Sequence, residues 1–240
     1  MKHAFTSQAE EVRTQKSDIN ALILDYLTVA GYPNAAAKFS SEANLPAQQP
    51  ASSIHIRQRI QRLIHKGEIE DAIQVLNAEY PSILDEDDAL LFALLRLQLV
   101  ELIRECNSSP NRDVRAALKF AQTKLGPKAA ANQEFLDDLE KTMSLLVFPQ
   151  DSLDPSLASL FQPGLRREVA EQVNQAILAL QLQRKEAAIR RLVQMRAWSE
   201  EVARKDTNKS LPPTIELGLD RDSNAHDDDI QNGHEPMITT

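Results

Sequence analysis

One stretch of the sequence, residues 89–103, is apolar on almost every side of the helix that it would form. Large apolar residues stand at Leu90, Leu91, Phe92, Leu94, Leu95, Leu97, Leu99, Val100, Leu102 and Ile103. A helix at a protein surface keeps one polar face, so a helix with apolar side chains all round has to be enclosed by other elements. The longest apolar run ends at Arg96 and is far shorter than the roughly 18 residues of a membrane span. We therefore expect a central helix in a helical bundle, without membrane insertion.

Amphipathic helices are predicted on both sides of this central helix, because apolar residues recur three and four positions apart. Near the N-terminus, a helix capped by Ser17 or Asp18 ends at Gly31, and Pro33 starts a second helix. A third helix is expected from Ser52 or Ser53 to Gly67 and a fourth over Glu68–Glu79, and the next one begins at Asp85, with Asp88 three residues on. Another is expected to begin at Asn111 and Asp113 and to end at Gly126-Pro127. The remaining helices are expected to begin at Asn132, to follow Pro163-Gly164, and to cover 189–198. No useful strand alternation is present. The predicted fold class is all-α, a helical hairpin followed by an antiparallel array of helices.

Negative charge is concentrated in the last part of the sequence. The chain has a formal net charge of -8, and Lys205–Thr240 contain eight acidic against three basic residues. The rest of the chain is therefore close to neutral and lacks the basic surface that nucleic-acid binders use to neutralise phosphates. Protein partners are expected, and no nucleic acid. The polar composition of 205–240 predicts a disordered acidic tail, and 1–16 a flexible leader.

The sequence offers little material for catalysis or for a bound metal. The glycines lie too far apart to form a phosphate-binding loop. The single cysteine, Cys106, and five scattered histidines do not give the ligand spacing of a zinc site. His65 is expected on a helix surface, where a catalytic role would need partners that no motif supplies. We therefore predict no cofactor, no metal and no enzymatic activity. The lone cysteine and the absence of an apolar leader predict a cytoplasmic and nuclear protein.

The N-terminal hairpin has more apolar surface than it can bury by itself. A hairpin of roughly 28 residues leaves one apolar face of each helix without a partner, so it should dimerise or dock. The residues predicted to bind a partner there are Leu22, Ile23, Tyr26, Leu27 and Phe39. A second set is predicted on the central helix, at Leu90, Leu91, Phe92 and Leu95, although residues of this kind more commonly fill a core. A third set is Val173, Ile177 and Leu180 on the long helix after Pro163-Gly164.

The order of these segments resembles proteins built from a LisH motif, a CTLH domain and a CRA domain. The segment INALILDYLTVAGYPNAAAKFSSEANL is similar to LisH motifs, with Ala35 in place of the usual Thr. Similarity to a CTLH domain is found in the segments IHKGEIEDAI, LLF at 90–92 and VELIRE. Similarity to a CRA domain is found in ALKFAQTKLGPKAAANQEFLDDLEKTMSLLVFP and in REVAEQVNQAIL. The implied domains are LisH at 17–45, CTLH at 52–108 and CRA at 109–204, with long C-terminal helices.

Among such proteins, this short chain is most similar to the glucose-induced degradation protein eight family. That resemblance implies a scaffold subunit of the GID/CTLH ubiquitin ligase, which directs metabolic enzymes to proteasomal degradation. The implied partners are other LisH-CTLH-CRA subunits, among them a SPRY-containing subunit and RING-bearing subunits, and a substrate-receptor module. LisH and late CRA are implied to form one dimer surface, and CTLH with early CRA another. An alternative function is a LisH-type dimerisation adaptor in a cytoskeletal or transcriptional complex.

Overall fold

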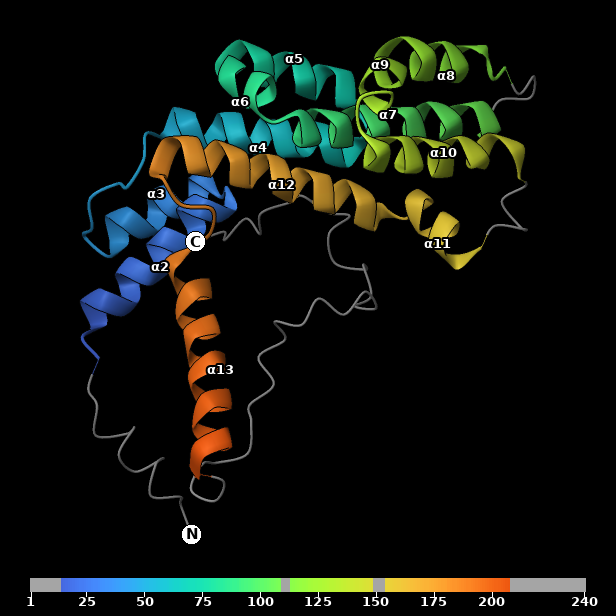
Figure 1. Ribbon diagram of the computed structural model, residues 1–240. Coiled ribbons are helices and arrows are strands. Elements are labelled where there is room, and N and C mark those ends of the chain that lie inside the picture. Colours follow the sequence, from blue (N-terminus) through green and yellow to red (C-terminus); the bar gives the residue numbers. More distant parts are fainter. Residues whose placement is uncertain (1–13, 109–112, 149–153, 208–240) are drawn as a thin grey trace.

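The computed structural model describes residues 14–108, 113–148 and 154–207, which contain helices and no strand (Figure 1). The predicted all-α fold class is therefore confirmed. The elements in chain order are α2 (Lys16–Ala30), α3 (Pro33–Glu42), α4 (Ala51–Lys66), α5 (Ile69–Glu79), α6 (Pro81–Glu86), α7 (Asp88–Ser108), α8 (Arg115–Phe120), a π-helical turn (Ala121–Leu125), α9 (Gly126–Ala129), α10 (Gln133–Val147), α11 (Pro155–Ala158), a 3-10 turn (Ser159–Phe161), α12 (Pro163–Leu182) and α13 (Ala188–Thr207). None of the described helices has the length and apolar character that crossing a membrane requires.

The central helix predicted from residues 89–103 is α7, and the core is built round it in two parts. One part joins α7 to α4, α5 and α12, and the other joins it to α8, α10 and the turns between them. Leu94 and Leu97 of α7 point into the first part, and Leu99 and Ile103 into the second. All four are almost completely buried. Helix α7 is apolar on all sides because other helices cover it on several sides, as the sequence indicated.

The N-terminal hairpin, α2 with α3, lies beneath one end of α4 and α12 (Figure 1). Its tight connection depends on Gly31, which ends α2 with φ +85°, a left-handed conformation that disfavours side chains. Pro33 then occupies the first turn of α3, where its missing N–H costs no hydrogen bond. The buried face of α2 carries Leu24 and Val29. The face that points away from the body is described below.

Several predicted helix boundaries are wrong, each by a few residues. Helix α2 begins at Lys16, before Ser17 and Asp18, and α4 begins at Ala51, so neither Ser52 nor Ser53 caps it. The cap of α7 is Asp87, whose carboxylate accepts a hydrogen bond from the backbone N–H of Leu90 at 2.9 Å. Gly126-Pro127 does not end a helix. The chain passes through the π-helical turn into α9, and a proline is tolerated there because it lies in the first helical turn.

The last helix, α13, projects from the body (Figure 1). Helix α12 ends at Gln183 in a left-handed conformation with φ +54°, and the chain turns before α13 begins. Helix α13 packs mainly against α2, and none of its described side chains is fully buried. It runs to Thr207, so its last three residues fall within the segment 205–240 that the sequence assigns to the tail. The rest of that predicted tail, 208–240, and the predicted leader up to residue 13 lie outside the described residues.

Candidate protein-interaction surface

The outward face of α2 carries large apolar side chains that the described part of the chain leaves exposed. Ile19, Ile23 and Tyr26 are spaced by four and three residues and therefore lie on one side of the helix. All three are exposed, Tyr26 to 46 %. The opposite side of α2 already packs against the body through Leu24 and Val29. Helix α2 thus has two apolar faces, and within residues 14–108, 113–148 and 154–207 only one of them is buried.

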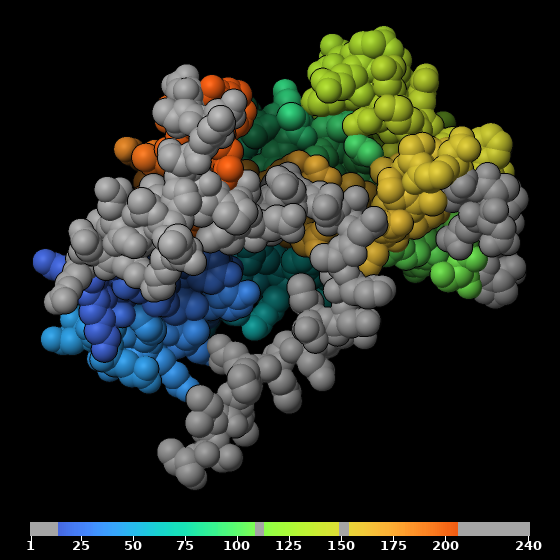
Figure 2. Space-filling model, turned by 90° about the horizontal axis from the view of Figure 1, so that it is seen from below, coloured from blue at the N-terminus to red at the C-terminus, as the bar shows by residue number. Residues whose placement is uncertain are grey.

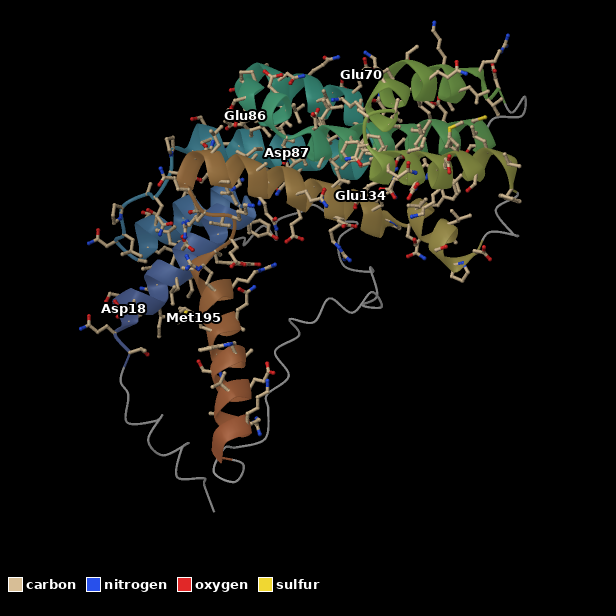
Figure 3. All side chains as sticks on the ribbon, viewed as in Figure 1. Asp18, Glu70, Glu86, Asp87, Glu134 and Met195 are labelled. Atoms are coloured by element: carbon tan, nitrogen blue, oxygen red, sulfur yellow. The ribbon has the colours of Figure 1, made fainter. Side chains whose placement is uncertain are left out.

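Helix α13 presents a second exposed apolar stripe. Its members lie three or four positions apart, at Ile189, Leu192, Met195, Trp198 and Val202. Trp198, the only tryptophan of the chain, is 66 % exposed. Met195 projects from α13 on the side where α2 carries Asp18 (Figure 3). Apolar side chains of this size, gathered on two neighbouring helices, are typical of a protein–protein interface.

A buried carboxylate fixes the angle at which these two helices meet. Asp25 of α2 is only 5 % exposed, and one of its oxygens accepts a hydrogen bond from the backbone N–H of Ala188 at 2.8 Å. Ala188 is the first residue of α13, so Asp25 supplies from another helix the cap that a serine or aspartate normally supplies locally. Its other oxygen accepts from Arg184. The negative charge also favours the positive end of the α13 dipole.

A buried arginine fixes the other end of α2. Arg57 of α4 is fully buried, and its guanidinium donates to the carbonyl oxygens of Thr28 and Val29 at 2.7 and 3.0 Å. Those carbonyls belong to the last turn of α2, which has no helical partners for them. The same group donates to Gln49 at 2.8 Å and to Asn174 of α12 at 3.2 Å. Burial lowers the pKa of Arg57 from its usual value, but the cationic form remains the donor to all four acceptors.

A further group of exposed apolar side chains lies at the opposite end of the body. Val147 and Phe148, at the end of α10, are 75 % and 51 % exposed, and Leu118 of α8 is also exposed. Helices α8 and α10 both pack on α7. Figure 2 shows α10 and α11 in yellow-green and yellow at one end of the molecule and the N-terminal hairpin in blue at the other. The two apolar surfaces are therefore well separated.

The described residues contain a broad hollow but no cluster of metal ligands. In that part of the chain, no group of three or more His, Cys, Asp or Glu side chains could hold a metal ion. A hollow of about 1360 Å³ has a lining of mixed polarity that comes from α7, α10, α11, α12 and α13 and includes Gln172, Gln175 and Arg190. His65 is exposed, and its backbone carbonyl accepts a hydrogen bond from Arg166. The features of this surface point to recognition of a protein.

Comparison with known proteins decides the family. The family described as "CTLH/CRA C-terminal to LisH motif domain" matches residues 53–204, and the LisH family matches residues 17–43. GID complex subunit 8 of Schizosaccharomyces pombe is 39 % identical over 206 residues, which cover 85 % of this chain and 86 % of the relative. The chain belongs to the glucose-induced degradation protein 8 family. The resemblance expected from the sequence is confirmed.

Two more relatives show how far the similarity extends. The glucose-induced degradation protein 8 homolog of Dictyostelium discoideum is 38 % identical over 190 residues, covering 79 % of this chain and 80 % of the relative. Ran-binding protein 9 of Xenopus tropicalis is 33 % identical over 93 residues, or 39 % of this chain and 17 % of that protein. The chain thus matches glucose-induced degradation protein 8 homologues along most of their length, and Ran-binding protein 9 over a short part.

The LisH residues predicted to bind a partner differ in their exposure to solvent. Ile23 and Tyr26 are exposed on the outward face of α2, whereas Leu22, Leu27 and Phe39 are half-buried. Of the three residues predicted on α12, Leu180 is 53 % exposed and is available to a partner. The α13 stripe was not among the predicted site residues. Its spacing was visible in the sequence at 189–198, but the sequence does not show that the helix leaves the body.

The predicted partner-binding residues of α7, and two of those on α12, lie in or against the core of this chain. Leu90, Phe92 and Leu95 are buried in the core of a single chain, and Leu91 is half-buried against it. The ring of Phe92 stacks on Phe135, with 4.2 Å between the centroids. The remaining two, Val173 and Ile177, are buried in the part of the core that joins α7 to α12. These side chains stabilise the fold and do not offer an accessible surface.

Proposed function

We propose that the chain is a non-catalytic scaffold subunit of a GID/CTLH-type ubiquitin ligase. It bridges a substrate-receptor module and RING-bearing subunits, so that metabolic enzymes are ubiquitinated and degraded by the proteasome. The name of the Schizosaccharomyces pombe relative, GID complex subunit 8, supports membership of such a complex. The observation that carries the scaffold role is the pair of exposed apolar stripes on α2 and α13. We further propose that the chain works in the cytoplasm and the nucleus.

The first docking surface consists of the outward faces of α2 and α13. Its proposed partner is a second LisH-CTLH-CRA chain, including the SPRY-containing subunit, which would contribute a matching pair of helices. Trp198 and Tyr26 are the expected anchors, because large aromatic side chains dominate the energetics of interfaces. Covering the exposed part of a tryptophan stabilises a complex by about 3 kcal/mol at roughly 25 cal/mol per Å². Asp25 and Arg57 hold the two helices in place before the partner arrives, which reduces the entropy cost of binding.

The second docking surface is formed by Val147, Phe148 and Leu118. It replaces the buried α7 residues as the proposed contact of the CTLH and early CRA part, here with a RING-bearing subunit. Its distance from the first surface allows two partners to bind at once (Figure 2). A chain that holds two proteins together raises their effective concentration without making or breaking a bond. No catalytic residue is needed for this role.

Size measurement in solution tests the first surface. The tagged full-length chain is purified under native conditions, and its assembly mass is measured by light scattering after size-exclusion chromatography. The double variant Tyr26→Asp/Trp198→Asp should shrink the assembly, because it places two charges in an apolar contact. Gln74→Asp, on the exposed side of α5, is the control and should leave the mass unchanged. An unchanged mass in the double variant would reject the surface.

Identification of the co-purified proteins tests the ligase assignment separately. Mass spectrometry of the native assembly should find RING-bearing and SPRY-containing chains. Recovery of the chain as a lone monomer would overturn the scaffold role. Recovery with cytoskeletal or transcriptional proteins, and no RING-bearing chain, would favour a LisH-type adaptor instead. Fluorescence microscopy of the endogenous protein tests the proposed location, and exclusion from both compartments would contradict it.

A further inference from the structure

The outer face of α4 carries a row of basic side chains. His55, Arg59, Arg62 and Lys66 are spaced by four, three and four residues, so they lie on one side of the helix. All four are exposed. Together with Gln58 and Leu63 they line a hollow of about 320 Å³. The opposite side of α4 is buried through Ile60 and Ile64, so the basic row faces away from the core.

This basic row lacks charge partners in the described part of the chain. Arg59, Arg62 and Lys66 form no ion pair with residues 14–108, 113–148 or 154–207. Some other exposed cations are paired, for example Arg196 with Glu200 and Lys205 with Glu201. A row of unneutralised positive charges along about 16 Å of helix creates a local potential that attracts an acidic chain segment.

The same sequence contains a segment of complementary charge. Residues 220–229 include Asp220, Asp222, Asp227, Asp228 and Asp229, with Arg221 as the only Lys or Arg. We propose that this acidic segment of the chain docks in cis on the basic face of α4. The proposal goes beyond the scaffold function and does not depend on it. It concerns residues outside the described ranges, and it is argued from their sequence and from the geometry of α4.

The connection is long enough for docking within one chain. From Thr207, where α13 ends, about 13 residues lead to Asp220 and about 22 to Asp229, which span roughly 45 and 75 Å when extended. The way back along α13 is about 30 Å, and α4 is about 24 Å long. Helices α4 and α12 run antiparallel, because Gln49 bonds to Gln181 and the carbonyl of His65 to Arg166. The end of α4 near His55 is therefore closer to the start of α13, and Lys66 is farther away.

This geometry assigns a register to the acidic segment. In the proposed register, Asp220 and Asp222 dock near His55 and Arg59, and the run 227–229 docks near Arg62 and Lys66. Tethering keeps the local concentration of the segment in the millimolar range, which compensates for the weakness of individual exposed ion pairs. An acidic segment of another protein would have to compete with this internal one. The interaction should weaken as salt rises, because exposed charges are screened.

Zero-length cross-linking of the full-length chain tests the proposal. A water-soluble carbodiimide joins Lys66 to a carboxylate only when the two are in contact, and mass spectrometry locates the links. We expect links from Lys66 to 227–229 about tenfold more frequent than links from the exposed Lys119 to the same residues. High salt should remove this preference. Equal yields at Lys66 and Lys119 would overturn the proposal.

A variant of α4 that keeps Lys66, the lysine whose cross-links are counted, provides a second test. Arg59→Gln/Arg62→Gln removes two charges but leaves Lys66 in place, and should reduce its links to the level of Lys119. Circular dichroism verifies that the variant is folded. Asp220→Asn/Asp222→Asn removes two charges of the segment but keeps the carboxylates 227–229 available for cross-linking, and should also lower the links without altering α4. Arg167→Gln/Arg191→Gln is the charge-matched control. Unchanged links in the first variant, or links mainly between ¹⁵N-labelled and unlabelled chains in a mixture, would contradict docking in cis.

Discussion

Replacement of Arg57 by methionine should detach the LisH hairpin from the body. Methionine keeps most of the apolar stem but has no donor, so the carbonyls of Thr28 and Val29 and the amide oxygens of Gln49 and Asn174 lose their charged partner. Hydrogen bonds to a charged group contribute about 1.5–3 kcal/mol each, and losses that share one donor do not add. Removal of a buried charge returns several kcal/mol of desolvation cost. We expect a net loss of about 3 kcal/mol.

Denaturation with urea, followed by circular dichroism at 222 nm, measures this loss in the free energy of unfolding. For a chain of this length, about 3 kcal/mol corresponds to a drop in melting temperature of roughly 6–12 °C. Arg167→Met, on the exposed side of α12, is the control and should change stability by no more than about 0.5 kcal/mol. Hydrogen exchange should rise in α2 and α3 while α7 stays protected. A stability loss below about 1 kcal/mol would refute the reasoning, because methionine would then stabilise the fold nearly as well as the charged Arg57.

Three further substitutions test the packing and the helix ends by thermal unfolding. Leu145→Ala should cost about 2–5 kcal/mol, because Leu145 is buried in the α7–α10 core, and a loss below about 1 kcal/mol would contradict that packing. Asn132→Ala should cost about 1 kcal/mol by removing the acceptor of the Glu134 N–H at the start of α10, whereas Asn132→Asp should restore it. Gly67→Ala should destabilise by about 1–2 kcal/mol, since φ is +84° and a Cβ would lie 2.9 Å from a guanidinium nitrogen of Arg166. An unchanged melting temperature for Gly67→Ala would show that this turn relaxes freely.

The fold could be predicted because helix periodicity and burial have the same physical origin. The all-round apolar pattern of 89–103 required a covered helix, and α7 is that helix. Gly31 and Pro33 also act as predicted, because their backbone restrictions are local. The predictions of helix boundaries were wrong where tertiary contacts outweigh local sequence signals. Asp87, for example, caps α7 although the spacing had indicated Asp85 and Asp88.

The exposed apolar surface could be predicted only in part. A short hairpin has to expose one apolar face, and Ile23 and Tyr26 lie on such a face of α2. The stripe through Trp198 shows the same spacing as a buried stripe, so the sequence alone does not distinguish the two. Its exposure follows from the direction of α13, which the bond from Asp25 to Ala188 helps to fix. Those two residues are 163 positions apart, and no local pattern connects them.

The bridging role is tested most directly by asking whether the two surfaces hold different partners. Tyr26→Asp/Trp198→Asp and Val147→Asp/Phe148→Asp are expressed separately as tagged full-length chains, and co-purified proteins are quantified by mass spectrometry against the unaltered chain. The account predicts that the first variant loses SPRY-containing chains and keeps RING-bearing chains, and that the second does the reverse. Loss of the same partners from both variants, or retention of all partners by both, would contradict a scaffold with two independent docking surfaces.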